Sequence, residues 1–261
     1  MAQVQVSNPL EIIIVPVLND NYAYLVRSSD GTTAAVDPAA AGPVLAKLDE
    51  LGWKVDFVLN THHHHDHVGG NLAVKKATGC QIVGPASERD RIPGIDVALA
   101  ASDSFALGDA AATVSEAPGH TLGHITFWFE SAGVLFSGDV LFAMGCGRLF
   151  EGSAETMWPA LDKLRELPAE TLVYCGHEYT ESNGRFALSV EPGNAALQNR
   201  CENVAALRSR GEPTIPFTIA DELETNPFLR PESGEIRQKL GLEGAKDVDV
   251  FAAVRRLKDQ F

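Results

Sequence analysis

The chain has 261 residues, of which 45% are hydrophobic and 21% charged, and its formal net charge is −14. This composition is typical of a folded globular protein with one or two domains, and it excludes a disordered tail, a collagen-like repeat and a coiled coil. The acidic balance argues against binding to nucleic acid or to an anionic membrane, so an anionic substrate would need a local basic patch.

Short runs rich in β-branched and apolar residues predict strands through the first two thirds of the chain. In chain order they are Ile12–Leu18, Tyr22–Arg27, Thr33–Asp37, Phe57–Thr61, Gln81–Gly84, Thr113–Ala117, His124–Phe129, Val134–Gly138 and Leu172–Cys175. Helical spacing appears between them at Pro43–Leu51, Gly70–Thr78 and Ala154–Leu167. The pattern predicts a mixed α/β fold built from layers.

After Tyr179 the strand pattern stops, and helices are expected at Asn194–Ser209 and Asp247–Asp259, joined by proline-containing loops. The change predicts a catalytic domain over residues 1–177 and a C-terminal helical domain over residues 178–261. In the last helix, Phe251, Val254 and Leu257 have the spacing of a buried face.

The N-terminal sequence lacks the features of a secretory signal, and no run approaches the roughly 18 apolar residues that cross a bilayer. The four cysteines are scattered and form no CxxC pair, which predicts reduced thiols: Cys80, Cys146, Cys175 and Cys201. We therefore expect a cytoplasmic monomer with no membrane or nucleic-acid partner.

All eight histidines fall in three short segments, THHHHDHVGGN, PGHTLGH and YCGHEY. Such clustering indicates a metal site, because neutral imidazole is a common metal ligand and several must converge on one ion. The first cluster follows a predicted strand, where open α/β sheets place their sites.

Alternation along the first cluster predicts which of its side chains share a direction. His62 and His64 would point together at one ion and Asp66 and His67 at another, whereas His63 and His65 would face away. The ligands that complete the site are expected after later strands, namely His120, Asp139 and His177. Asp139 supplies a carboxylate that can bridge two cations. For His124 we expect a packing or capping role.

The T-H-x-H-x-D-H motif at Thr61–His67, with the three later ligands, resembles the metallo-β-lactamase superfamily. Within it the likeness to the glyoxalase II (hydroxyacylglutathione hydrolase) family covers nearly the whole chain. It is carried by Leu18–Tyr22, Val36–Pro38, Thr61–Asn71, Ala117–His124, Phe136–Gly152, Cys175–Thr180, Glu191–Asn194, Thr225–Arg230 and Ala253–Phe261. The resemblance implies an α/β, four-layer αβ/βα sandwich with a C-terminal helical domain that binds substrate.

The resemblance also implies two divalent metal ions, with zinc favoured over iron or manganese. One ion would be held by His62, His64 and His120, and the other by Asp66, His67 and His177, with Asp139 and a hydroxide bridging. The catalytic residues would be Asp66 and Asp139, with the hydroxide as the nucleophile. The implied reaction is hydrolysis of the thioester S-D-lactoylglutathione to glutathione and a 2-hydroxy acid, the second step of methylglyoxal detoxification.

A thioester suits such a site because its thiolate leaving group, with a parent thiol pKa of about 8.5, departs without a strong general acid. By resemblance the substrate contacts are Arg148, Leu149, Phe150, His177, Tyr179, Asn183, Arg255 and Lys258. Phe150 departs from the family, which often has tyrosine there. Cys175 is expected to be a buried small residue rather than a nucleophile.

Two other functions are considered. A mono-iron sulfur (persulfide) dioxygenase of the same superfamily would leave the second ligand set and the C-terminal RRLKDQF segment without a use. A non-catalytic, metal-stabilised binding protein would leave a complete set of hydrolytic ligands without a use.

Overall fold

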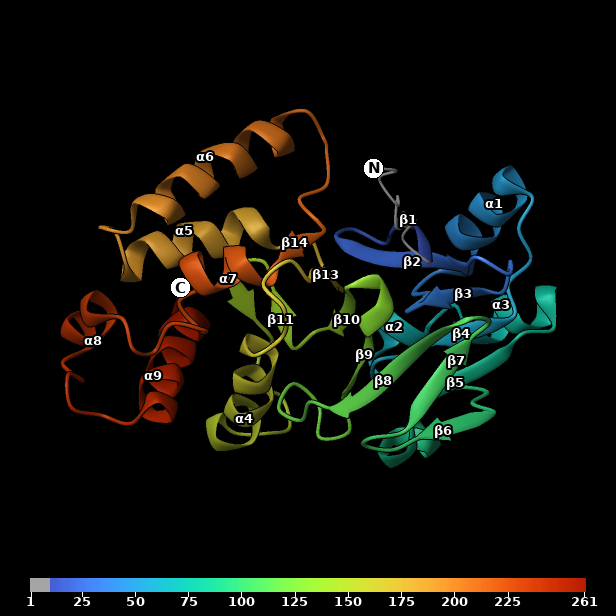
Figure 1. The fold of residues 1–261 in the computed structure, drawn as a ribbon, viewed down its shortest axis with the longest axis horizontal. Coiled ribbons are helices and arrows are strands. Elements are labelled where there is room, and N and C mark those ends of the chain that lie inside the picture. The colour runs from blue at the N-terminus through green and yellow to red at the C-terminus, as the bar shows by residue number, and fades with distance from the viewer. Residues whose placement is uncertain (1–9) are drawn as a thin grey trace, which may run out of the picture. The chain divides into compact units, whose positions relative to one another are not determined.

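The structure, a computed structural model, describes residues 10–261 and contains two six-stranded sheets and a series of helices toward the C-terminus (Figure 1). The first sheet has its strands in chain order. They are β1 Leu10–Val17, β2 Asn21–Ser28, β3 Thr33–Val36, β4 Phe57–Leu59, β5 Gln81–Pro85 and β6 Val97–Leu99. Strands β1 to β3 pair antiparallel, and β3 to β6 pair parallel.

Helices connect the parallel strands of this sheet, as parallel pairing requires. They are α1 Ala41–Leu51, α2 His65–Val68, α3 Asn71–Thr78 and the 3₁₀ turn Ala86–Arg91. Val44 and Leu48 of α1 and Val74 of α3 are buried in one hydrophobic cluster with Val58 and Ile82 of the sheet. Because both helices bury their apolar sides in this cluster, they lie beside each other on one face of the sheet (Figure 1).

The second sheet has the strand order β14-β13-β10-β9-β8-β7. Its strands are β7 Ser104–Leu107, β8 Ala110–Glu116, β9 Ile125–Phe129, β10 Val134–Gly138, β13 Leu172–Cys175 and β14 Phe217–Thr218. Between β9 and β10 runs the 3₁₀ turn Glu130–Ala132. A separate antiparallel pair is formed by β11 Leu141–Phe142 and β12 Gly145–Cys146.

Six further helices carry the later part of the chain. They are α4 Ala154–Arg165, α5 Thr180–Val190, α6 Ala195–Ser209, α7 Ile219–Thr225, α8 Gly234–Leu240 and α9 Asp247–Gln260. The Asn194 side chain caps α6, and Thr218 and Asp221 form a capping box at α7, so these polar residues satisfy amide groups that the helices leave open. Helix α5 packs against α6, and α9 packs against α4 and α8.

All the strands and helices expected from the sequence are present, with ends shifted by no more than three residues. Two expectations were wrong. Strand structure does not stop at Tyr179, because β14 pairs antiparallel with β13; two residues are too short to show an alternating pattern. Leu257 is 40% exposed rather than buried, since the hollow beside Phe186 and Phe261 opens to solvent at this last turn of α9.

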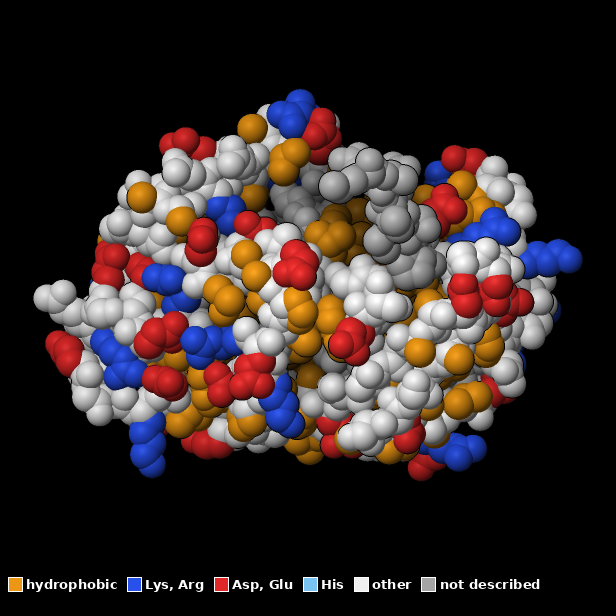
Figure 2. Space-filling model, in the orientation of Figure 1, with side chains coloured by type: hydrophobic (Ala, Val, Ile, Leu, Met, Phe, Trp, Pro, Cys, Tyr) orange, Lys and Arg blue, Asp and Glu red, His pale blue; other side chains and the backbone are white. Residues whose placement is uncertain are grey.

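The described residues form two compact units. The first takes in the chain up to Ser115 together with Phe127–Val134, and the second consists of Glu116–Thr126 and Leu135–Phe261. The predicted domain boundary at residue 177 stays a prediction. On the face drawn in Figure 2, acidic and basic side chains are interspersed. Within the described part of the chain, no helix is long and apolar enough to cross a membrane.

Candidate metal centre

In the first unit, a buried carboxylate holds both ends of the histidine-rich loop. Parallel pairing sets Val36 of β3 opposite Leu59 of β4, so Asp37 comes beside the residues that follow β4. Asp37 Oδ1 accepts from the Thr61 amide at 2.9 Å, and Oδ2 lies 2.7 Å from Thr61 Oγ1 and 3.0 Å from His67 Nδ1. A carboxylate only accepts hydrogen bonds, so His67 carries its proton on Nδ1 and presents the lone pair of Nε2.

In the histidine-rich loop, the two predicted pairs, His62 with His64 and Asp66 with His67, can be compared with the structure of this unit. His62 Nε2 lies 3.1 Å from His64 Nδ1, and His67 Nε2 lies 3.9 Å from Asp66 Oδ2. Asp66 and His67 belong to α2, a single turn, so adjacent residues there do not alternate as in a strand. Asn21 fixes Asp66 by donating its Nδ2 to Oδ2 at 3.2 Å and to the main-chain oxygen at 3.1 Å.

Two histidines were expected to face away from the metal, and their surroundings differ. The His63 amide donates to Glu88 Oε2 at 2.7 Å, and its Nδ1 lies 2.8 Å from the same oxygen. His65 is exposed. Gly70 lets the loop return to the sheet, because a Cβ at this position would lie 2.2 Å from the carbonyl oxygen of Pro38.

In the second unit, three residues from three separate segments converge. Asp139 follows β10, His120 lies in the loop after β8, and His177 follows β13. Asp139 Oδ2 lies 3.4 Å from His120 Nε2 and 3.3 Å from His177 Nε2. All three side chains are at least nine-tenths buried. Within this unit the three residues thus come after strands and lie together, and their role as metal ligands stays a prediction.

Neighbouring groups fix the orientation of these ligands. His120 Nδ1 donates to the carbonyl of Arg148 at 2.9 Å, which leaves Nε2 as the acceptor atom. The amide of Asp139 donates to His124 Nε2 at 3.0 Å, so the fully buried His124 holds the aspartate backbone rather than capping a strand. The ring of His177 stacks on Tyr179 with centroids 4.6 Å apart.

The donor set of each unit fits a divalent cation. The lone pair of His120 Nε2 faces the Asp139 carboxylate, and the lone pair of His67 Nε2 faces the Asp66 carboxylate. Two electron-rich atoms so close repel each other unless a proton or a metal cation lies between them. Nitrogen from histidine and oxygen from aspartate suit zinc, iron and manganese.

The residues expected to contact substrate differ in exposure. Phe150 is 60% exposed and Tyr179 37%, and the Arg148 side chain is also exposed. The side chain of Leu149 is partly buried. Asn183 is buried, and its Nδ2 donates to the carbonyl of Ala143.

Two basic residues of α9 lie near one another. Arg255 is 5% exposed and donates from Nη1 to the Cys146 carbonyl at 2.9 Å. Lys258 Nζ lies 3.4 Å from the carbonyl of Ser182. Burial, with the charges of Arg255 and Arg185, lowers the pKa of Lys258 to about 8.

Sequence reasoning missed several polar residues that support the loop and its ligands. Asp37 and Glu88 lie far from the histidines along the chain, and nothing in the sequence around them indicates a contact. The expectation for Cys175 is confirmed: it is fully buried, burial raises the pKa of its thiol, and Sγ donates to the carbonyl of His177.

Comparison with known proteins places the chain in a family. The family described as the metallo-β-lactamase superfamily matches residues 18–177, and the family described as hydroxyacylglutathione hydrolase C-terminus matches residues 178–261. A hydroxyacylglutathione hydrolase of Methylococcus capsulatus is 62% identical over 97% of this chain and 99% of the relative. One from Rhodospirillum rubrum is 53% identical over the same shares. The chain belongs to the hydroxyacylglutathione hydrolase family.

The fold of this chain is also seen in solved structures of low sequence identity. The BLEG-1 B3 metallo-β-lactamase superimposes with a TM-score of 0.66 at 23% identity, covering 84% of this chain and all of that one. The predicted fold class, a metallo-β-lactamase fold with α/β sheets and a C-terminal helical region, is confirmed.

Proposed function

We propose that this hydroxyacylglutathione hydrolase family member hydrolyses the thioester of a 2-hydroxyacylglutathione, with S-D-lactoylglutathione as the expected substrate. The observation that carries the proposal is the match of 97% of the chain to hydroxyacylglutathione hydrolases, joined to the presence of histidine and aspartate side chains that could bind metal in the two described units. The ligands would be His62, His64, His120, Asp66, His67, His177 and Asp139, and two zinc, iron or manganese ions would be held by them.

Bound divalent ions would supply a hydroxide at neutral pH, by lowering the pKa of water toward neutrality, and would polarise the thioester carbonyl. The protein's own part is to keep the ligand atoms in the correct protonation state. Asp37 holds the proton of His67 on Nδ1, and the Arg148 carbonyl does the same for His120. The thiolate of glutathione would leave without a general acid, because a thiolate is a far better leaving group than an alkoxide.

Substrate recognition would use the basic residues of the second unit. Asp259 Oδ1 lies 2.9 Å from Arg255 Nη2 and 3.6 Å from Arg148 Nε. Two guanidinium groups can thus converge on one carboxylate, which is the arrangement that a glutathione carboxylate needs. We propose that such a carboxylate takes the place of Asp259, with Lys258 adding charge beside it.

Aromatic and small polar side chains would hold the rest of the glutathionyl group. The remaining proposed contacts are Leu149, Phe150, His177, Tyr179 and Asn183. Phe150 carries no hydroxyl, so it would contact the peptide by packing alone. The Arg148 guanidinium lies 5.9 Å from the centre of the Phe150 ring, which keeps the two side chains next to each other.

The test is to load the protein with zinc and follow loss of the thioester absorbance of S-D-lactoylglutathione. A thioester with the same acyl group but no glutathionyl part serves as the comparison. We expect kcat/KM to be higher on the glutathione thioester. Oxygen uptake by a one-iron protein acting on a glutathione persulfide would favour the dioxygenase, and lack of hydrolysis by fully metal-loaded protein would favour a binding protein.

A further inference from the structure

A buried carboxylate in the second unit has no part in the mechanism above. Glu222 of α7 has no exposed surface, and its Oε2 accepts from the amide of Met144 at 2.9 Å and from Asn226 Nδ2 at 2.6 Å. Its Oε1 lies 2.6 Å from Arg200 Nη2. A charged side chain this deeply buried needs such partners, because removal from water disfavours the charge.

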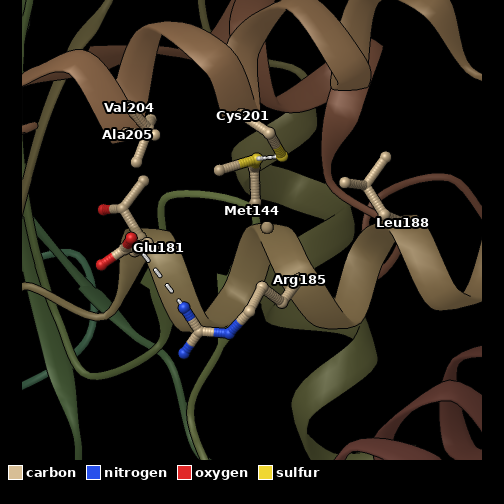
Figure 3. A pocket seen from close by; sticks show the side chains of 9 residues that line it. Met144, Glu181, Arg185, Leu188, Cys201, Val204 and Ala205 are labelled. Carbon is tan, nitrogen blue, oxygen red and sulfur yellow. Dashed lines mark hydrogen bonds and ion pairs between the residues drawn. The ribbon is translucent and has the colours of Figure 1, made fainter.

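The amide that Glu222 holds belongs to a residue with an unusual backbone. Met144 has a φ of 53°, in the left-handed region that residues with a side chain adopt rarely and that persists only where surrounding contacts enforce it. Its side chain is fully buried between α5 and α6 and approaches Cys201 Sγ at 4.0 Å, beside a cavity of about 150 Å³ (Figure 3). Met144 is therefore anchored by both its side chain and its main chain.

The segment that follows Met144 leads directly to the proposed glutathione contacts. Asn226 Nδ2, which also donates to Glu222, lies 2.9 Å from the carbonyl oxygen of Gly145. Beyond it, the carbonyls of Cys146 and Arg148 accept from Arg255 and His120. Gly147 has no room for a side chain, because a Cβ would lie 1.9 Å from the carbonyl oxygen of Asp139. Because these contacts fix the segment from Gly145 to Arg148, the backbone conformation of Met144 determines where Arg148 lies.

We propose that Glu222, together with Asn226, is a positioning residue that holds Met144 in its left-handed conformation and thereby places Arg148 for binding the glutathionyl group. This inference rests on the proposed function. The contacts described for Glu222 are to Met144, Asn226 and Arg200 and include none of the proposed metal ligands or substrate contacts, so its effect on substrate binding would be made through the segment from Met144 to Arg148.

The chemistry of the cluster requires a carboxylate rather than an amide. Oε2 faces two donors and Oε1 faces the Arg200 guanidinium, so both oxygens must accept. In Glu222→Gln one of the two positions becomes an NH₂ group that points at a donor or at a cation. Either orientation breaks a contact while the shape of the side chain is kept.

A matched control exists in the same unit. Glu191 is also buried and is paired with an arginine, with Oε1 2.8 Å from Arg230 Nη2. Its other partners are Asn194 and Ser233, and the contacts described for it do not involve the segment from Met144 to Arg148. Glu191→Gln therefore reproduces the loss of a buried charge without disturbing Met144.

The experiment compares the zinc-loaded parent, Glu222→Gln, Asn226→Ser and Glu191→Gln. KM and kcat are measured on S-D-lactoylglutathione and on a thioester without glutathione, and the Kd of glutathione is measured by calorimetry. For Glu222→Gln and Asn226→Ser we expect KM and Kd to rise about tenfold, the effect of losing one charge-assisted contact. We also expect zinc content, kcat and hydrolysis of the simple thioester to match the parent. Glu191→Gln is expected to melt at a lower temperature with unchanged KM.

Asn226→Ser keeps a small polar side chain, and it tests the proposal if Glu222→Gln does not fold. Unchanged KM and Kd in the folded variants would overturn the proposal, as would an equal rise in Glu191→Gln or a loss of zinc that accounts for the defect. If the parent binds glutathione without hydrolysing its thioester, the proposed function fails. The ratio of the Kd of the Glu222→Gln or Asn226→Ser variant to the Kd of the parent still decides the role of Glu222. If the parent does not bind glutathione, the role of Glu222 in placing Arg148 for it is refuted as well.

Discussion

Replacing Asp37 with asparagine keeps the shape of a buried side chain but changes the hydrogen-bonding pattern behind a proposed metal ligand. Asp37 is 3% exposed and accepts from the Thr61 amide on one oxygen, and from the Thr61 hydroxyl and His67 Nδ1 on the other. An asparagine has one oxygen, so its NH₂ group must face either the Thr61 amide or the Nδ1 proton of His67. If it faces His67, the ring proton moves to Nε2, the atom proposed to bind metal.

The size of the effect follows from these contacts. Each hydrogen bond to the carboxylate contributes roughly 1.5–3 kcal/mol, and loss of one lowers metal affinity by a factor of about 10 to 150. Loss of the partner of a metal-binding histidine commonly costs about 10- to 100-fold, in the same range. We therefore expect Asp37→Asn to bind zinc about 10- to 100-fold more weakly than the parent.

The assay is competition for zinc with a chromophoric chelator, with circular dichroism to confirm folding. Asp56→Asn is the matched control, because Asp56 Oδ2 accepts only from the Thr33 amide at 2.9 Å among its described hydrogen bonds and contacts no histidine. This control should keep the parent affinity. Parent-like zinc affinity in a folded Asp37→Asn protein would refute the role assigned to Asp37.

Three further predictions concern the ligands and the substrate site. His63→Ala should keep the parent metal content, because His63 contacts Glu88, whereas His64→Ala should lose metal; loss of a metal equivalent in His63→Ala, measured by elemental analysis, would contradict this. Asp139→Asn should lower both metal retention and kcat by orders of magnitude, and a fully loaded, fully active variant would exclude a bridging role. Since the pKa of Lys258 is lowered to about 8, its amine becomes neutral above that pH and attracts a carboxylate less, so kcat/KM on the glutathione thioester should fall there. Lys258→Arg should lack this fall, and an identical pH profile in the variant would assign the titration to another group.

The clustering of the histidines could be predicted from the sequence, whereas the residues that support them could not, for a physical reason. His62 to His67 lie next to one another in the chain, so their clustering is visible as a pattern. Asp37 and His67 are 30 residues apart in sequence, and they meet only because β3 and β4 pair in parallel. Its contact depends on strand register, which composition and spacing do not reveal.

Buried polar residues in the later part of the chain were missed for a related reason. Glu222 lies among other polar residues in the sequence and looks like a surface position, and for His124 only a packing or capping role was expected; both are fully buried. Their partners, the amides of Met144 and Asp139, are main-chain groups that carry no signal of their own. Arg255 was expected by resemblance to contact the substrate, and its burial against the Cys146 carbonyl depends on the packing of α9, which the sequence does not reveal.

The central claim is that two metal ions act together in thioester hydrolysis. It is tested most directly by adding zinc in known amounts to metal-free protein and measuring kcat on S-D-lactoylglutathione at each step. We predict that activity rises until two equivalents are bound per chain and then levels off. Full activity at one equivalent, or two bound equivalents without hydrolysis, would contradict it.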